Sequence, residues 1–375
     1  MSASRGFTNW LAFALAFVGM DVLLFGVFFG YLNLPTQVAT RLDRIERQLD
    51  LAIGDAPDYD RMARELHTLA LLHGSDARVH TVSAQVEYQR GFRYSVGSRA
   101  VHDPEALTAV LTHVHRALQL DSTQAQARRL EAAVLLEQHQ PDAAREAALS
   151  AERLAPHLPA NQLMFADLAM AGEEWEAAIH HAETAKLMSA SASVHIAAEQ
   201  RLCDVWLKLG RTDRAESCHV AILRYAPRMA WSHHNYGLFL LHQDRYDEAI
   251  QQEERALALR DFLLAKLTLS AAWYAKGLGC LFNPGQADLA KTCFEKAIAC
   301  DSTNANAWYG LAMYRENQAA KNGDLALLAS VEPALERALA LDPTNSVARA
   351  ELQRHQALRL TQARIDSARM VVTAD

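Results

Sequence analysis

Residues 230–263, AWSHHNYGLFLLHQDRYDEAIQQEERALALRDFL, contain two short helix-forming stretches separated by a polar turn. Small residues stand where the two helices must touch, Gly237 in the first stretch and Ala249 in the second. Apolar residues at helical spacing, including Tyr246 and Ala256, supply the side of the second helix that we expect to be buried. The stretch therefore predicts a helical hairpin, which needs a stacked neighbour to bury its apolar face.

The same hairpin pattern recurs along most of the chain. Small apolar residues equivalent to Ala249 occur at intervals of about 34 to 41 positions, at Ala144, Ala178, Ala215, Ala290 and Val331. A Leu, Tyr or Cys shortly before a Pro or Ser closes the units, in LQLDS at 118–122, RLAP at 153–156, RYAP at 224–227, ACDS at 299–302 and ALDP at 340–343. These residues end one helix pair and begin the next.

The 34-residue hairpin resembles the tetratricopeptide repeat, most closely at RYDEAI (245–250) and RALAL (255–259). The resemblance implies an all-α, right-handed α-solenoid of about seven helix pairs over residues 76–345, followed by a capping helix over 346–375. It also implies a partner-binding groove lined by the first helix of each pair. Carried onto this chain, the groove positions are Gln200, Asp204, Lys208, His234, Leu238, His242, Tyr309, Met313 and Asn317.

Residues 10–32, WLAFALAFVGMDVLLFGVFFGYL, form an apolar run with a single charge. As a helix this run is about 34 Å long, enough to cross the bilayer core. A cleaved signal peptide is the alternative, but its apolar stretch would be shorter. We therefore expect residues 1–35 to be an uncleaved transmembrane anchor that precedes the solenoid.

One side of this expected transmembrane helix is lined with small residues. Ala12, Ala16, Gly19, Gly26 and Gly30 share a stripe that would let another helix approach closely. Asp21 falls on the opposite side, and a carboxyl group at this depth usually faces protein or water. The pattern favours a helix integrated into a membrane complex, and a lone anchor is the alternative.

Residues 36–75 predict two membrane-proximal amphipathic helices. The first, over 36–53, could form a solvated stalk, pair with another helix or lie on lipid headgroups, and the second, over 58–73, could be half of a degenerate repeat. Arginines flank the apolar run on both sides, with Arg5 before it and three arginines over 41–47. The charge count leaves either orientation open. We expect a bacterial inner-membrane protein whose repeats lie on the periplasmic side.

Two insertions interrupt the repeat pattern and offer apolar side chains to a partner. The first, GFRYSVGSRAV at 91–101, carries Phe92 and Tyr94 next to arginines, and could rest on anionic headgroups or on another subunit. The second, KGLGCLFNPG at 276–285, carries Leu281 and Phe282. Apolar loops of this kind either contact a partner or pack into a neighbouring repeat.

The sequence gives no sign of catalysis or of nucleic-acid binding. The net charge is −7, and the arginines and lysines do not form a basic stripe. GxSxG, P-loop, GxGxxG and HExxH motifs do not occur, and no two histidines are four residues apart. We therefore predict no catalytic residue, no cofactor, no metal site and no small-molecule substrate.

Five cysteines leave at least one unpaired. Cys203 with Cys218, and Cys280 with Cys293, fall on opposite helices of one predicted hairpin and could lie close together. They could pack as buried free thiols, or pair in an oxidising compartment.

Together these features predict a non-catalytic, membrane-anchored scaffold subunit. It would bind other proteins, mainly integral-membrane subunits, through its repeats and its transmembrane helix, and it would contact lipid through the anchor. The alternative is an assembly factor or chaperone-like adaptor that binds client proteins transiently in envelope or cytochrome biogenesis.

Overall fold

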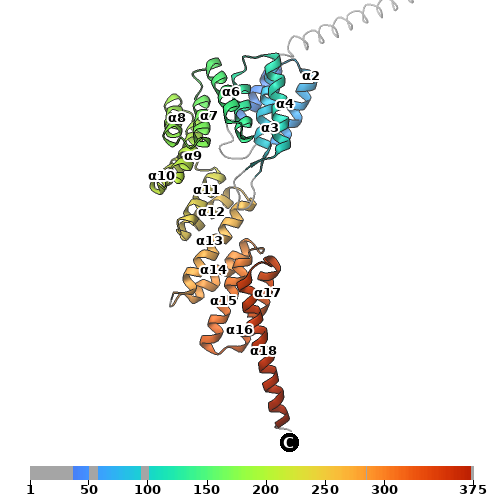
Figure 1. Cartoon of the computed structure of the whole chain (residues 1–375), viewed down its shortest axis with the longest axis vertical. Coiled ribbons are helices and arrows are strands. Elements are labelled where there is room, and N and C mark those ends of the chain that lie inside the picture. Colours follow the sequence, from blue (N-terminus) through green and yellow to red (C-terminus); the bar gives the residue numbers. More distant parts are fainter. Residues whose placement is uncertain (1–36, 50–57, 94–100, 284, 373–375) are drawn as a thin grey trace, which may run out of the picture. The chain divides into compact units, whose positions relative to one another are not determined.

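A computed structural model describes residues 37–49, 58–93, 101–283 and 285–372. These residues are almost entirely helical (Figure 1). The helices form two compact units that divide after Arg201, within helix α9, and each unit is described by itself. The predicted anchor, with Ala12, Ala16, Gly19, Asp21, Gly26 and Gly30, lies outside the described residues. Among the described helices, none has both the length and the apolar character that crossing a bilayer requires.

Seven consecutive helix pairs follow one another in the described residues between Ala77 and Leu341, as the repeat spacing predicts. In the first unit the helices are α2 (Tyr59–Leu72), α3 (Ala77–Arg90), α4 (Pro104–Leu120), α5 (Ala125–Glu137), α6 (Pro141–Leu154), α7 (Pro159–Ala171), α8 (Trp175–Met188) and the first part of α9 (Ala192–Lys208). In the second unit they are the rest of α9, α10 (Thr212–Tyr225), α11 (Ala230–His242), α12 (Tyr246–Leu259), α13 (Leu263–Leu281), α14 (Ala287–Cys300), α15 (Ala305–Asn322), the short α16 (Leu325–Ala329), α17 (Val331–Leu341) and α18 (Ser346–Val372).

The small residues that mark the period are buried in the second helix of each pair from α5–α6 onwards. Ala249 and its equivalents are all at most 1% exposed, namely Ala144, Ala178, Ala215, Ala290 and Val331. Because these side chains are small, the facing helices pack closely, and the predicted equivalence of these positions is confirmed.

The turn inside a hairpin has the same geometry in four successive pairs. His139, Glu173, Gly210 and Asp244 each adopt a left-handed backbone conformation, with φ between 58° and 68°. In each case the next residue donates its backbone N–H to a carbonyl five positions earlier, as from Gln140 to Leu135 at 2.9 Å. The left-handed residue and this hydrogen bond together end the first helix and set the direction of the second.

The turn between pairs also repeats, at three of the positions that the sequence marks as unit ends. Asp121 accepts hydrogen bonds from the backbone N–H of Thr123 at 2.9 Å and from its hydroxyl at 2.6 Å. Asp301 with Thr303 and Asp342 with Thr344 form the same two bonds at the same distances. A short Asp-x-Thr turn therefore connects one hairpin to the next.

The segment before the first repeat shares a core with the repeats. Val38, Leu42 and Ile45, on a helix over residues 37–49, pack with Met62, Leu66 and Leu69 of α2 and with Val79, Val82 and Val86 of α3. Arg78 of α3 also bridges to Asp43 and Glu46 on that helix. This part of residues 36–75 is therefore packed as an additional helix pair, rather than standing apart as a solvated stalk.

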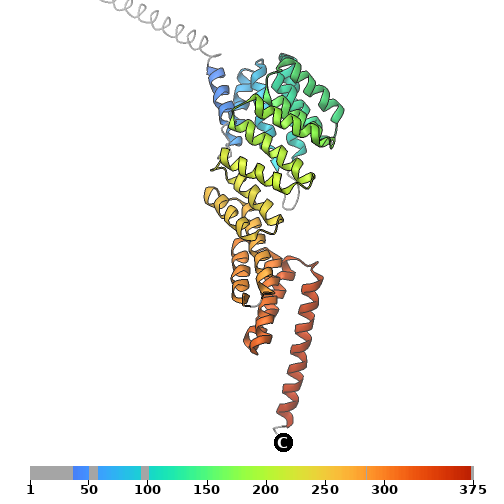
Figure 2. The same ribbon diagram turned by 90° about the vertical axis from the view of Figure 1, so that its left-hand side faces the viewer.

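Two features depart from a plain succession of helix pairs. A two-stranded antiparallel sheet, β1 (Phe92–Arg93) with β2 (Val101–His102), interrupts the helices between α3 and α4, with Phe92 opposite His102. At the other end of the chain, α18 runs well beyond α17 as a single long helix (Figures 1 and 2). Its first turns pack on α17 through Ala348 and Leu352.

Candidate functional site

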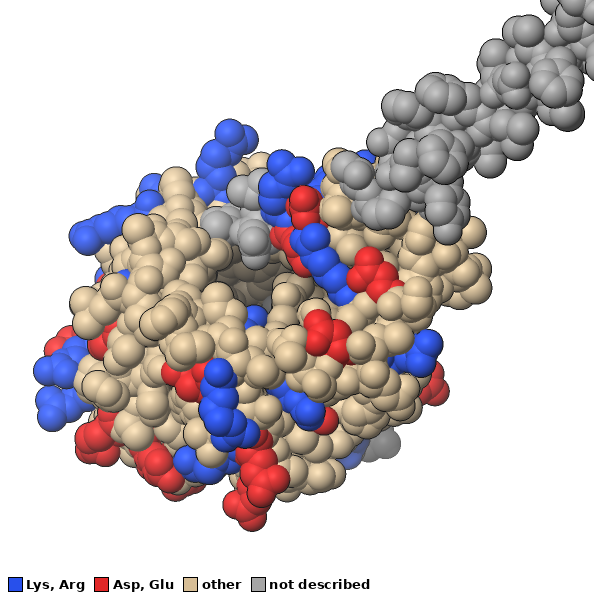
Figure 3. Space-filling view, turned by 90° about the horizontal axis from the view of Figure 1, so that it is seen from above, with Lys and Arg blue, Asp and Glu red and all other residues tan. Residues whose placement is uncertain are grey.

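The first helices of successive pairs stand next to one another in the first unit. α5 contacts both α3 and α7, while α4 and α6 each pack against their own first helix and the next one, and α8 packs against α7. This arrangement gathers the side chains of α3, α5, α7 and α9 on one side of the repeats. Figure 3 shows a hollow in the face seen from above, with acidic and basic side chains interspersed around it.

Polar side chains connect each first helix of this unit to the next. Gln126 of α5 donates to Gln85 of α3. Arg129 of α5 donates to Asn161 of α7 at 3.2 Å, and Arg201 of α9 donates to Asp167 of α7 at 2.6 Å. We call these six residues the polar ladder. Asp167 and Arg201 are partly exposed, and burial lowers the pKa of Arg129.

A second group of hydrogen bonds attaches the β-hairpin to the same side of the unit. The Tyr88 hydroxyl donates to Oε1 of Glu137 at 2.7 Å, and Nδ1 of His102 lies 2.7 Å from Oε2 of the same carboxylate. The rings of Tyr88 and His102 stack with centroids 4.2 Å apart. Burial, together with the Glu137 carboxylate, raises the pKa of Tyr88. Glu137 therefore fixes the end of α5 against both α3 and β2.

The sequence analysis did not single out the polar ladder, although a signal for it is present. Asp167 and Arg201 are 34 residues apart, and so are Ser270 and Asn304, whose side chains are hydrogen-bonded at 2.9 Å in the second unit. A separation of one full period therefore marks one pair of the polar ladder, whereas the other two pairs are 41 and 32 residues apart and carry no such mark.

Most of the predicted groove residues have side chains at a surface. Gln200, Asp204, Lys208, Leu238 and His242 are exposed, and Tyr309, Met313 and Asn317 are half-buried. The Tyr309 ring packs on the core of the last pair, beside Ala312 and Leu335. Oδ1 of Asn317 is buried and has no hydrogen-bond partner among the described residues.

His234 is the exception, because its side chain lies inside the α11–α12 pair. Its Nδ1 is 3.0 Å from both carboxylate oxygens of Glu253, which is itself fully buried. A Cβ at Gly237 would lie only 2.6 Å from that carboxylate, so this glycine makes room for Glu253. The assignment of His234 to the groove is therefore corrected.

The two predicted insertions differ in what the structure describes. Leu281 is the last residue of α13 and is 6% exposed, because it packs with Ala290 and Phe294 in a core cluster. Its assignment as a loop contact is therefore corrected. Phe282 follows directly and is 73% exposed. Tyr94 and the side chain of Phe92 lie outside what the structure describes.

The cysteines are part of the packing of the second unit. Cys203, Cys218, Cys280 and Cys293 are buried, and Sγ of Cys203 donates to the carbonyl oxygen of Ala215 at 3.4 Å. Burial is the main cause that raises the pKa of Cys293 to about 11. The Cys293 thiol is therefore a poor nucleophile at neutral pH. All four buried cysteines fill small positions in the core.

Stacked helical hairpins joined by repeated turns define a helical-repeat protein. Family profiles of the tetratricopeptide repeat match residues 228–303 and 293–326. Residues 228–326 therefore carry tetratricopeptide repeats. No curated protein sequence matches it.

Solved structures show the same fold. The C-terminal part of a tetratricopeptide repeat-containing protein from Cytophaga hutchinsonii matches 66% of this chain and 94% of that one, with 15% identity and a TM-score of 0.51. The human IFIT1 dimer with PPP-AAAA matches over 80% and 68%, with 12% identity and a TM-score of 0.51. A chain of the APC/C Cut9–Hcn1 hetero-tetramer matches with 13% identity and a TM-score of 0.49, over 83% of this chain but only 56% of that one. At 12–15% identity, the two matches with a TM-score of 0.51 show the fold alone.

Proposed function

We propose that this chain is a non-catalytic scaffold that holds a segment of another protein along the first helices of its repeats. The observation that supports this proposal is the polar ladder, in which polar and charged groups, all but the buried Asn161 partly exposed, recur from α3 to α9. Because ladder residues hydrogen-bond to one another, their side chains are held in place before a partner arrives. Binding then costs less side-chain entropy than it would on a surface of mobile groups.

The exposed groove positions on α9 and α11 offer further side chains to a partner. Gln200, Asp204 and Lys208 lie one helical turn apart on α9, and Leu238 and His242 lie one turn apart on α11. A face with an acid, a base and an apolar side chain suits an extended peptide or a helix that carries complementary charges. The mixed charges in Figure 3 argue against a ligand of a single strong charge, such as nucleic acid.

We further propose that residues 10–32 anchor this scaffold in a membrane, within a multisubunit complex. The support for this part is the sequence alone: an apolar run of bilayer-crossing length with a stripe of small residues opposite Asp21. Under this proposal, the repeats and the transmembrane helix contact the same complex.

The test is to purify the full chain in mild detergent and identify the proteins that migrate with it. We expect stoichiometric partners, and we expect the double variant Asp204→Arg/Lys208→Glu to recover at least about tenfold less of them, equivalent to about 1.4 kcal/mol of binding. The matched control is Glu254→Lys/Arg255→Glu. It also reverses an exposed acid and an exposed base, but on α12, the second helix of its pair, which carries none of the groove positions.

Three results would contradict parts of this proposal. A chain that migrates alone would contradict the scaffold function. Partners that are lost with the α12 control and kept with the α9 variant would contradict the choice of face. Unchanged co-purification of an Asp21→Leu variant would contradict the part assigned to the transmembrane helix. Substoichiometric partners that dissociate in salt would indicate a transient assembly factor instead.

A further inference from the structure

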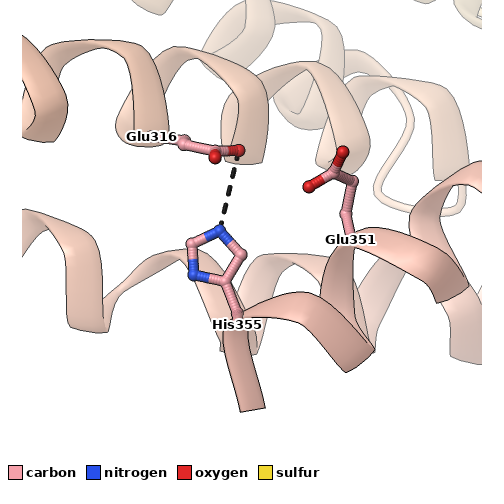
Figure 4. A group of neighbouring side chains, drawn as sticks. All are labelled: Glu316, Glu351 and His355. Carbon is pink, nitrogen blue, oxygen red and sulfur yellow. Dashed lines mark ion pairs between the residues drawn. The ribbon is translucent and has the colours of Figure 1, made fainter. Parts of the chain in front are cut away.

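Three side chains that can bind a metal ion converge where α18 crosses α15 (Figure 4). Glu316 comes from α15, and Glu351 and His355 lie one turn apart on α18. One donor atom from each residue lies within 4.8 Å of the other two. The site does not belong to the groove positions, and it lies wholly within the second unit.

His355 is the residue that distinguishes this cluster from an ordinary group of surface acids. It is 94% buried, being 6% exposed, and its Nε2 has no hydrogen-bond partner among the described residues. Figure 4 shows the ring directed towards Glu316, whose Oε2 lies 3.6 Å from Nε2. That separation is too long for a hydrogen bond, so a buried nitrogen points at a carboxylate without bonding to it.

The separation is close to that expected for two ligands of one metal ion. Zn²⁺ binds imidazole nitrogen and carboxylate oxygen at about 2.0–2.2 Å, so two ligands of a tetrahedral site lie about 3.4 Å apart. The observed 3.6 Å is close to this value. One imidazole and two carboxylates are a donor set that suits Zn²⁺ and similar divalent transition metals.

We propose that Glu316, Glu351 and His355 bind a divalent transition-metal ion of the zinc type, with water in the fourth position. The ion would join α18 to α15 and so fix how the long C-terminal helix leaves the last repeat. It would also give Nε2 of His355 the partner that it lacks.

Arg354 is the competitor for this site. Its guanidinium bridges the two carboxylates, bonding to Oε1 of Glu316 and, at 2.7 Å, to Oε2 of Glu351. The Arg354 side chain is half-exposed, and it can swing into solvent without disturbing the core. An arriving ion therefore displaces Arg354, and removing the guanidinium should strengthen metal binding.

The experiment uses the full chain in mild detergent after treatment with a chelator. Zn²⁺ is titrated calorimetrically, Co²⁺ is titrated by its visible absorption, and thermal unfolding is followed with and without Zn²⁺. We expect one equivalent of ion, a Zn²⁺-dependent rise in Tm, and at least a tenfold loss of affinity in both His355→Ala and Glu351→Gln. Arg354→Gln should bind at least several-fold more tightly.

The control is His115→Ala, because His115 is an exposed histidine that lies 3.8 Å from Glu131 in the first unit. If His115→Ala weakens binding as much as His355→Ala, or if no saturable one-equivalent binding occurs, the proposal is overturned. An unchanged affinity in Arg354→Gln would also overturn it, because the ion would then not use these carboxylates. Should His355→Ala fail to fold, Glu351→Gln still tests the site, because it keeps the shape of a partly exposed side chain.

Discussion

The carboxylate of Glu253 on α12 meets the imidazole of His234 on α11 inside the helix pair, with Nδ1 3.0 Å from each oxygen. Trp231 and Phe262 both meet the imidazole edge-on, with ring centroids 5.4 Å from it. Burial raises the pKa of Glu253 to about 7, and the hydrogen bond with His234 offsets only part of that effect. The folded chain therefore holds a proton at Glu253 over a pH range in which the unfolded chain has released it.

Glu253→Gln should remove a pH dependence of stability. Between pH 4.5 and 7 the folded state binds more protons at Glu253 than the unfolded state does. The contribution of Glu253 to the free energy of unfolding therefore falls as the pH rises. We expect the free energy of unfolding of the variant, relative to the unaltered chain, to increase over that range and then level off. The slope should reach at most about 1.4 kcal/mol per pH unit. Urea unfolding at pH 5, 6, 7 and 8 measures this difference in the free energy of unfolding.

The control is Glu254→Gln, on the exposed side of the same helix. If the difference between Glu253→Gln and the unaltered chain stays constant with pH, the assignment is contradicted.

His219→Phe should stabilise the chain, most of all in mild acid. His219 is buried against Tyr236 and Phe239, and its Nε2 has no hydrogen-bond partner among the described residues. Burial lowers the pKa of His219 to about 4, so its contribution to stability is complete above pH 6.5 and is lost as the pH falls towards 4. A phenylalanine fills the same space without an unpaired nitrogen. We expect a gain of about 1 kcal/mol at pH 7 and a larger gain at pH 5, measured by urea unfolding.

The exposed His157→Phe serves as the control for this change. It should leave stability within about 0.5 kcal/mol at both pH values. A loss of stability in His219→Phe at pH 5 would mean that the imidazole has a partner in solution, and would refute this prediction.

The repeat period in the sequence was sufficient to predict the fold, because this period reflects the size of the side chains at the helix crossings. A small residue must recur wherever two helices cross, and Ala249 and its equivalents do so. The buried polar groups could not be predicted in this way. His234 lies on a first helix at the spacing of groove residues, and only its approach to Glu253, 19 positions later, takes it into the interior.

The segment around Leu281 shows a second limit of the sequence pattern. Two glycines, Gly277 and Gly279, predict a break in the helix, yet α13 continues to Leu281. At Gly277 the reason is packing, because the ring of Phe294 occupies the space where a side chain would lie. A glycine needed for a close contact and a glycine that ends a helix have the same letter in the sequence, and only the packing of α14 distinguishes them.

Gly277→Ala and Gly279→Ala should therefore have opposite effects, although the two positions are two residues apart on α13. A Cβ at Gly277 would lie 2.7 Å from the Phe294 ring, which is fully buried, whereas a Cβ at Gly279 meets nothing within 4 Å. We expect Gly277→Ala to cost about 1–3 kcal/mol and Gly279→Ala to gain about 0.5–1 kcal/mol, because alanine favours a helix. Thermal and urea unfolding measure both. Equal effects at the two positions would show that Phe294 can move aside.

His139→Gly should stabilise the turn between α5 and α6. His139 has φ of 58°, a conformation that costs a side-chain-bearing residue about 1–2 kcal/mol and costs glycine almost nothing. Glycine also loses more entropy on folding, by about 0.5–1 kcal/mol, so the expected net gain in the free energy of unfolding is about 0.5 kcal/mol.

The control is Glu146→Gly, at an exposed position inside α6. It carries the entropy cost without relief of strain and should lose about 0.5–1 kcal/mol of stability. Because Gly210 already occupies the equivalent turn position between α9 and α10, glycine is compatible with this turn. A loss of stability in His139→Gly equal to that in Glu146→Gly would show that the left-handed turn carries no strain.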